Sequence, residues 1–91
     1  ALNAAPFNYS DPQQLLAFTS LNLVISEVSS KFNVSVANVF QAFATASAPY
    51  GGDTCEAGLL LKLANGTCDT HPNSTGQSLL ASTVVGATPK K

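Results

Sequence analysis

The pattern of apolar and polar residues predicts a long amphipathic helix in the first third of the chain. Asp11-Pro12 marks its start, because an aspartate N-cap accepts a free backbone amide, proline suits the first helical position, and Gln14 follows as a capping partner. The apolar residues that then share the spacing of one helix face are Leu21, Val24, Ile25, Val28 and Phe32. We therefore expect a helix from Asp11 to Phe32 that buries this face and ends with Asn33 as its C-cap.

A short strand is expected after this helix. The run from Val34 to Phe40 is rich in β-branched residues and alternates apolar with small or polar side chains. A helix followed by a strand is typical of an α/β sheet. The residues from Gln41 to Ala44 fit one further helical turn, and the dense Ser, Pro, Gly and Asp content from Ser47 to Asp53 predicts a surface loop.

The last third of the chain predicts a hairpin and a second helix. The apolar run Leu59–Leu63 is followed by Asn65-Gly66, the preferred pair for a two-residue type I′ turn. Asn73 or Ser74 is expected to cap a helix, whose buried face would hold Leu79, Leu80, Thr83, Val84 and Ala87. Pro89 and the two lysines after it are expected to form a frayed tail.

Length and composition exclude several classes of protein. A chain of 91 residues is one domain or a piece of one. It is 45% hydrophobic and 10% charged, with a net charge of −1 and no arginine, so it has no positive surface for nucleic acid or anionic lipid. No stretch reaches the roughly 20 continuous apolar residues of a transmembrane helix.

The two cysteines indicate a disulfide. Cys55 and Cys68 are too few ligands for a closed zinc site, because the chain has no second cysteine pair and one histidine. Closing the loop between them would stabilise the fold by about 3 kcal/mol, and such a bond persists only in an oxidising compartment. We therefore expect a secreted protein whose signal peptide has been removed.

His71 is the candidate acid–base residue. It lies in a constrained polar segment before a helix, and an imidazole can accept and return a proton at neutral pH if a partner fixes its tautomer. Asp69 is the expected partner, because residues i and i+2 of an extended segment project to the same side, and Pro72 keeps His71 out of helical geometry. The alternative is a surface histidine beside an aspartate that has no function.

The residues around this pair resemble a known family. Asp69-Thr70-His71-Pro72-Asn73, then Gly76, then Leu79-Leu80-Ala81 is similar to the C-terminal block of the SGNH (GDSL) hydrolases. A long helix, a strand leading to an aspartate-like position at Asn38 and a variable loop precede it in the family's order. The resemblance implies a three-layer α/β/α, flavodoxin-like fold. Residues 1–91 would be the C-terminal segment of one such domain, with two main helices, a short strand and a disulfide-braced loop.

The resemblance also implies a function. The chain would be part of a secreted carboxylic-ester hydrolase, an esterase, lipase or carbohydrate esterase, that works by Ser-His-Asp acyl transfer without metal or organic cofactor. His71 would be the base and Asp69 its orienting acid, although the family usually spaces these residues as D-x-x-H, which would put Cys68 in the acid's place. The family's substrates include lipids, acetylated polysaccharides and small esters, and the implied substrate stays open among them.

The family's nucleophile and oxyanion hole lie in N-terminal blocks that this chain does not contain. Gly52-Asp53-Thr54 resembles the nucleophile block only superficially, because no buried strand precedes it. The expected partner is therefore the N-terminal portion of the same hydrolase, and the chain alone is not expected to be active. Two alternatives remain: a small secreted helical protein that binds an apolar ligand without catalysis, and a segment with a purely structural role.

Overall fold

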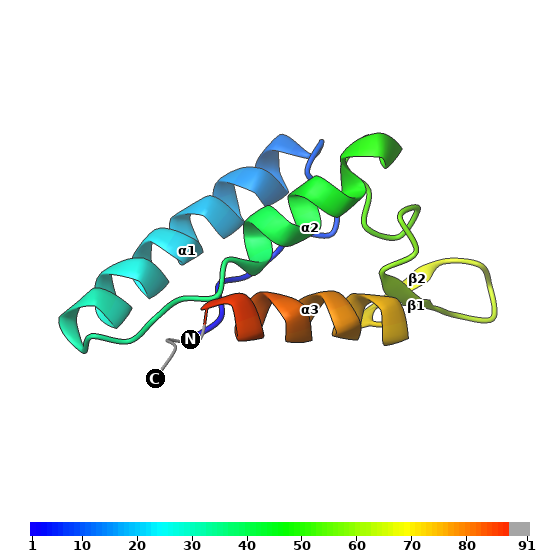
Figure 1. Cartoon of the computed structure of the whole chain (residues 1–91). Coiled ribbons are helices and arrows are strands. Elements are labelled where there is room, and N and C mark those ends of the chain that lie inside the picture. Colours follow the sequence, from blue (N-terminus) through cyan, green and yellow to red (C-terminus); the bar gives the residue numbers. More distant parts are fainter. Residues whose placement is uncertain (88–91) are drawn as a thin grey trace.

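The computed structural model describes residues 1–87 as three α-helices and one antiparallel hairpin (Figure 1). The elements in chain order are α1 (Pro12–Lys31), α2 (Val39–Ser47), the 3₁₀ helix η1 (Ala48–Tyr50), β1 (Leu60–Lys62), β2 (Cys68–Pro72) and α3 (Ser74–Ala87). The mixture of helices and strands confirms the α/β class in its coarse form. The expected frayed tail at Pro89 lies outside the described residues. None of the helices within residues 1–87 is long and apolar enough to cross a membrane.

Both ends of α1 follow from local capping. The Asp11 side chain accepts from the backbone amides of Gln13 and Gln14, and Pro12 occupies the first turn, as predicted. At the other end Asn33 adopts a left-handed φ of 53°, one residue beyond the observed C-cap Phe32. The amide of Val34 donates to the carbonyl of Ser29 at 2.9 Å, which closes the reversal of a Schellman motif.

The strand predicted from Val34 to Phe40 is wrong, because the run forms only a single bridge at Ala37 and its last two residues, Val39 and Phe40, already belong to helix α2. The Asn38 side chain accepts from the backbone amide of Gln41 at 3.1 Å and so caps a helix that starts at Val39. Val39, Phe43 and Ser47 then fall at four-residue intervals and are all buried. Burial of this helical face outweighed the β preference of Val39.

An extended segment remains before α2, and it pairs with the N-terminus of the chain. Leu2 and Ala37 form a parallel bridge, in which the Ala37 amide donates to the Ala1 carbonyl at 2.7 Å. The chain between these two segments passes through α1. Parallel strands joined by a helix are the connection found in βαβ units, so this bridge is a minimal parallel element at the base of α1.

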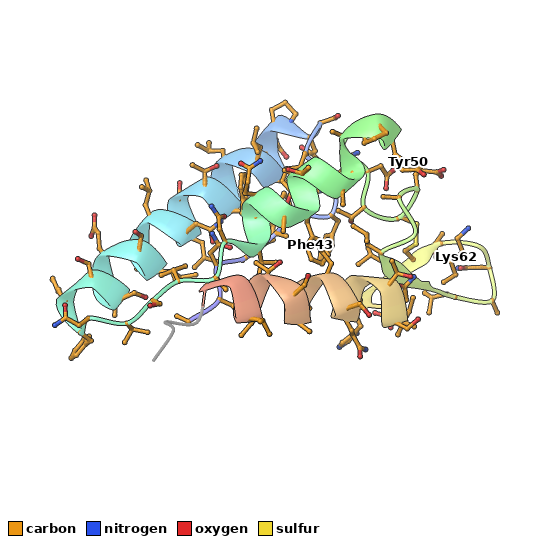
Figure 2. The ribbon with its side chains drawn as sticks, in the orientation of Figure 1. Phe43, Tyr50 and Lys62 are labelled. Carbon is orange, nitrogen blue, oxygen red and sulfur yellow. A yellow bond between two sulfur atoms is a disulfide. The ribbon has the colours of Figure 1, made fainter. Side chains whose placement is uncertain are left out.

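The face of α1 that was expected to be buried is largely exposed, which corrects the prediction. Val24 is 57% exposed and Phe32 is 73% exposed, and only Ile25 of the predicted set is half-buried. The buried residue of α1 is Ser29. Side chains along α1 project away from the rest of the molecule in Figure 2. The described residues contain too few elements to cover a helix of 20 residues on this side.

The core lies where α2 packs against α3 and the start of the hairpin. Val39, Phe43 and Leu59 form its buried centre, and Phe43 lies between α2 and α3 (Figure 2). Leu79 and Leu80 of α3 pack against this centre as predicted, whereas Val84 of the same predicted face is 40% exposed. Helix α2, for which the sequence predicted only one further helical turn, therefore supplies two of the three residues of the buried centre, Val39 and Phe43.

The hairpin has the predicted strands but a different turn. Leu63 and Thr67 close a three-residue loop through a 2.7 Å bond from the Leu63 amide to the Thr67 carbonyl. Gly66 has a φ of 86°, whereas Asn65 does not have a positive φ. A type I turn followed by a left-handed glycine fits these angles, whereas a type I′ turn needs positive φ at both central residues.

Candidate functional site

The two predicted site residues lie side by side on β2. The Nδ1 atom of His71 is 3.1 Å from Oδ1 of Asp69. They are two positions apart on an extended strand and therefore share a face, as expected from the sequence. The structure thus brings the proposed base and its proposed orienting acid into hydrogen-bond distance within one short segment.

Asp69 is held as a carboxylate by its neighbours. The hydrogen bond with His71 lowers the pKa of Asp69 below its usual value, and the Thr70 backbone amide, which donates to Oδ1 at 2.6 Å, lowers it further. An ionised carboxylate can only accept hydrogen bonds, so Nδ1 of His71 must carry the shared hydrogen. In the neutral ring Nε2 is then the free acceptor, the state that a general base requires.

The His71 side chain is open to its surroundings. It is 74% exposed, and the Asp69 side chain is 38% exposed. Among residues 1–87, Asp69 supplies the one polar side-chain contact of His71. No hydroxyl or thiol of the described chain therefore occupies the position of a nucleophile at Nε2.

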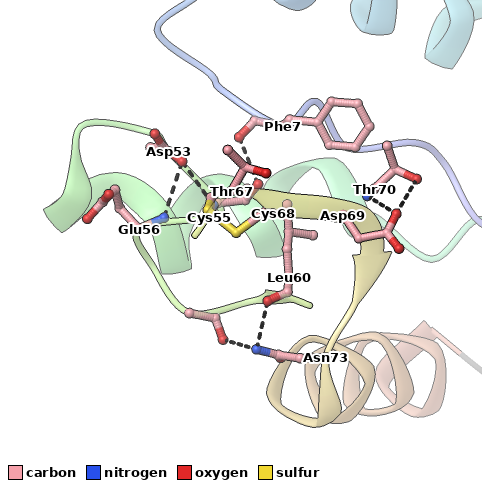
Figure 3. The surroundings of a disulfide bond; sticks show 12 residues. Phe7, Asp53, Cys55, Glu56, Leu60, Thr67, Cys68, Asp69, Thr70 and Asn73 are labelled. Carbon is pink, nitrogen blue, oxygen red and sulfur yellow. Dashed lines mark hydrogen bonds between the residues drawn. A yellow bond between two sulfur atoms is a disulfide. The ribbon is translucent and has the colours of Figure 1, made fainter. Parts of the chain in front are cut away.

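A disulfide and a turn hold β2 on its N-terminal side. Cys68, the first residue of β2, is bonded to Cys55 with a Cα–Cα distance of 5.9 Å, which confirms the predicted pairing (Figure 3). Cys55 is itself fixed, because Oδ1 of Asp53 accepts from the backbone amides of Cys55 at 2.9 Å and Glu56 at 3.2 Å. The strand that carries Asp69 and His71, a pair called the dyad below, therefore starts from a covalently fixed point.

Asn73 holds the C-terminal side of β2. Its Nδ2 donates to the Gly58 carbonyl at 2.7 Å and to the Leu60 carbonyl at 3.2 Å, as Figure 3 shows. Its Oδ1 accepts from the Gly76 amide at 2.9 Å and so caps α3, as predicted. One side chain therefore joins β1, β2 and α3 two residues after His71.

Thr54 has no access to the dyad's solvent-facing side. It is 1% exposed, and its hydroxyl donates to the carbonyl of Phe7 at 2.7 Å. The Phe7 carbonyl also accepts from the Thr54 amide at 3.0 Å. The Gly52-Asp53-Thr54 segment is thus a structural anchor for the N-terminal residues, in keeping with the superficial nature of its likeness to a nucleophile block.

The anchored N-terminal segment creates a groove that the sequence analysis missed. This groove, called the β2 groove below, has a volume of about 370 Å³ and lies along β2 beside Asp69. Its lining residues are Phe7, Asn8, Asp53, Cys55, Leu60, Thr67, Cys68, Asp69 and Thr70. Residues 7 and 8 line the groove together with residues about 60 positions later in the chain. The periodicity of apolar residues gives no signal for contacts between such distant segments.

Metal ligands do not gather in the part of the chain that the structure describes: it contains no group of three or more His, Cys, Asp or Glu side chains arranged to hold an ion. The dyad itself offers one carboxylate and one imidazole. A carboxylate in hydrogen-bond contact with an imidazole is an arrangement that can support proton transfer at the imidazole.

Comparison with known proteins does not assign the chain to a family. No protein-family model, curated protein sequence or solved structure matches it. The resemblance of the block from Asp69 to Ala81 to SGNH hydrolases therefore stays a prediction from the sequence.

Proposed function

We propose that this chain supplies the acid–base half of an ester hydrolase that works by Ser-His-Asp acyl transfer. His71 accepts the proton of an attacking hydroxyl at Nε2 and later donates it to the leaving alcohol. Asp69 accepts a hydrogen bond from Nδ1–H of His71 and stabilises the imidazolium that forms between these steps. The observation that carries the proposal is the 3.1 Å contact between His71 and Asp69 on a strand fixed at both ends.

The nucleophile and the oxyanion hole belong, in this proposal, to polypeptide that packs on the exposed face of α1. Leu16 and Leu23, which are seven positions apart and so share one face of this helix, are 70% and 62% exposed. Apolar exposure of this extent marks an interaction surface. We infer that the covering polypeptide is the N-terminal portion of the same hydrolase, and that the assembled protein is extracellular.

The parallel bridge between Leu2 and Ala37 supports the same arrangement. Parallel sheets are covered by helices on both faces and contain several strands, so one isolated bridge beneath α1 is an incomplete sheet. Further strands on this bridge would produce the three-layer α/β/α fold and would bury α1. We propose that fold for the assembled enzyme.

The alternative of an enclosed apolar ligand receives less support. The cavity beside Val39, Phe43 and Leu80 has a volume of about 140 Å³. Sites for small molecules usually measure about 300 to 1,000 Å³. A non-catalytic binding protein would need a larger apolar cavity within its core than α2 and α3 enclose.

Hydrolysis of a short-chain aryl ester by the natural protein tests the proposal. Replacement His71→Gln should lower kcat by a factor of about 10³ or more, since the residual rate then comes from binding and the oxyanion hole alone. A serine-directed fluorophosphonate should label a serine outside residues 1–91. Undiminished turnover in His71→Gln, or an intact mass equal to these 91 residues with no associated polypeptide, would contradict the proposal.

A further inference from the structure

We propose that Asn65, at the turn of the β1–β2 hairpin, is the residue of this chain that carries an N-linked glycan. This modification lies beyond the proposed hydrolase function and does not depend on it. Four asparagines begin an Asn-x-Ser/Thr sequence, the acceptor motif for N-glycosylation: Asn8, Asn33, Asn65 and Asn73. The motif alone does not separate them, whereas their surroundings in the fold do.

Asn65 is presented on an exposed turn with its amide nitrogen free. Asn65 and Thr67 are both exposed, and the loop that holds them projects from the end of the hairpin (Figure 1). Oδ1 of Asn65 accepts from the Thr67 hydroxyl at 2.6 Å and from the Thr67 amide at 3.1 Å. Nδ2 of Asn65 has no hydrogen-bond partner among residues 1–87. The two side chains of the motif are therefore already adjacent, and the nitrogen that accepts the sugar is open to an enzyme.

Glycosylation at this position preserves the local contacts. A bond forms between Nδ2 and the anomeric carbon of an oligosaccharide, and the bond from that carbon to a polyprenyl-pyrophosphate donor breaks. The polyprenyl pyrophosphate leaves, and one proton of Nδ2 passes to a base of the transferase. Oδ1 of Asn65 takes no part in the new bond, so it keeps both hydrogen bonds from Thr67. A glycan on Asn65 therefore extends into solvent without breaking a hydrogen bond within residues 1–87.

Asn73 cannot carry a glycan without loss of native contacts. Its Nδ2 donates to the carbonyl of Gly58 at 2.7 Å and to that of Leu60 at 3.2 Å. A glycosylated Nδ2 keeps one hydrogen, so at least one of these two carbonyls would lose its partner. Asn73 is also half-buried between the hairpin and the start of α3, where a sugar would have to displace one of them.

Asn8 and Asn33 lack the paired arrangement of the hairpin motif. Asn8 is half-buried and forms an antiparallel bridge, and the Ser10 hydroxyl of its motif donates to the Gly51 carbonyl. Asn33 is exposed, but it ends α1 in a left-handed conformation, and no hydrogen bond within residues 1–87 joins its side chain to Ser35. Of the four motifs, all of which lie in the described part of the chain, the hairpin motif alone joins its asparagine to its hydroxyl.

The Cys55–Cys68 disulfide agrees with passage through a compartment in which glycans are added. Disulfides form in the lumen of the endoplasmic reticulum and persist outside the cell. Transfer of oligosaccharide to asparagine takes place in that same lumen. Cys68 directly follows the motif, so the disulfide also fixes one end of the loop that presents Asn65.

Peptide mapping of the protein as secreted by its own cells tests the assignment. Peptide-N-glycosidase in heavy-oxygen water converts a glycosylated asparagine to a labelled aspartate, which mass spectrometry then locates. We expect label at residue 65 and none at residue 73. In secreted variants, Asn65→Gln and Thr67→Val should each lose the glycan and its mass on a gel. The matched control Asn33→Gln, which removes another exposed motif, should keep the mass of the wild type.

The opposite outcomes would overturn the inference. These are an unlabelled residue 65, a labelled residue 73 in folded protein, or an Asn65→Gln variant that keeps its glycan mass. Asn65 belongs neither to the dyad nor to the lining of the β2 groove. The glycan assay therefore gives its answer independently of the His71→Gln assay of the proposed hydrolase.

Discussion

Replacement of Gly76 by alanine should destabilise the protein, although alanine is the better helix former. Gly76 lies in the first turn of α3 and is buried. A Cβ atom at this position would lie 2.2 Å from the carbonyl oxygen of Leu59 and 2.8 Å from Cβ of Pro72. The Leu59 carbonyl cannot move freely, because it accepts from the Asn73 amide at 2.9 Å. The added methyl group must therefore displace α3 from the hairpin.

The two contributions to the change in stability have opposite signs. Overpacking of this kind costs about 1 to 3 kcal/mol, and contact with backbone favours the upper end of that range. The helix propensity of alanine offsets this cost by about 1 kcal/mol. We expect Gly76→Ala to lower the free energy of unfolding by about 2 kcal/mol, which corresponds to a fall in the urea midpoint of about 1 to 2 M.

Gly86 of the same helix is the matched control. A Cβ atom there would meet no atom within 4 Å, so Gly86→Ala carries the propensity gain without the clash. It should leave the urea midpoint unchanged or raise it. The largest expected gain in the free energy of unfolding is about 1 kcal/mol. A Gly76→Ala protein as stable as the wild type would refute the close approach of α3 to Leu59.

Three further measurements follow from the site. Removing the disulfide as a Cys55→Ala/Cys68→Ala double variant should lower the free energy of unfolding by about 3 kcal/mol in urea titrations, and a change below about 1 kcal/mol would contradict its bracing role. NMR titration of the Asp69 carboxyl should give a pKa below the usual value, and His71→Ala should raise it. Because the folded pKa is depressed, this pairing stabilises the protein above the unfolded pKa and is lost as pH falls through the folded one. Asn73→Ala should cost about 1 to 2 kcal/mol by circular-dichroism melting, since the helix cap is lost; an unchanged melting temperature would exclude the cap.

The sequence predicted those features that depend on neighbouring residues. The start of α1 at Asp11, the cap of α3 at Asn73 and the geometry of Asp69 beside His71 each involve contacts across two or three positions. Capping chemistry and strand alternation act over that range and can be read directly. The disulfide was predictable for a different reason, because Cys55 and Cys68 had no other partner.

The features that the sequence did not predict depend on distant contacts. The residues from Val39 onward have a β-branched start, yet the cap at Asn38 and burial against Leu59 and α3 make them a helix. The exposure of Val24 depends on what covers α1, which its own spacing cannot reveal. The β2 groove arises because Thr54 anchors Phe7, a contact across 47 positions.

The short separation of Asp69 and His71 has a consequence for folding order. In many acid–base pairs the two side chains come from distant parts of the chain, and the pair forms only when the whole domain has closed. Here the loop to be closed spans two residues, so almost no chain entropy opposes the contact. Once the hairpin has formed on a microsecond timescale, the proposed base His71 already has its proposed orienting acid Asp69. Later docking of another polypeptide would meet a preassembled pair, and slow steps in assembly would delay activity without altering the dyad.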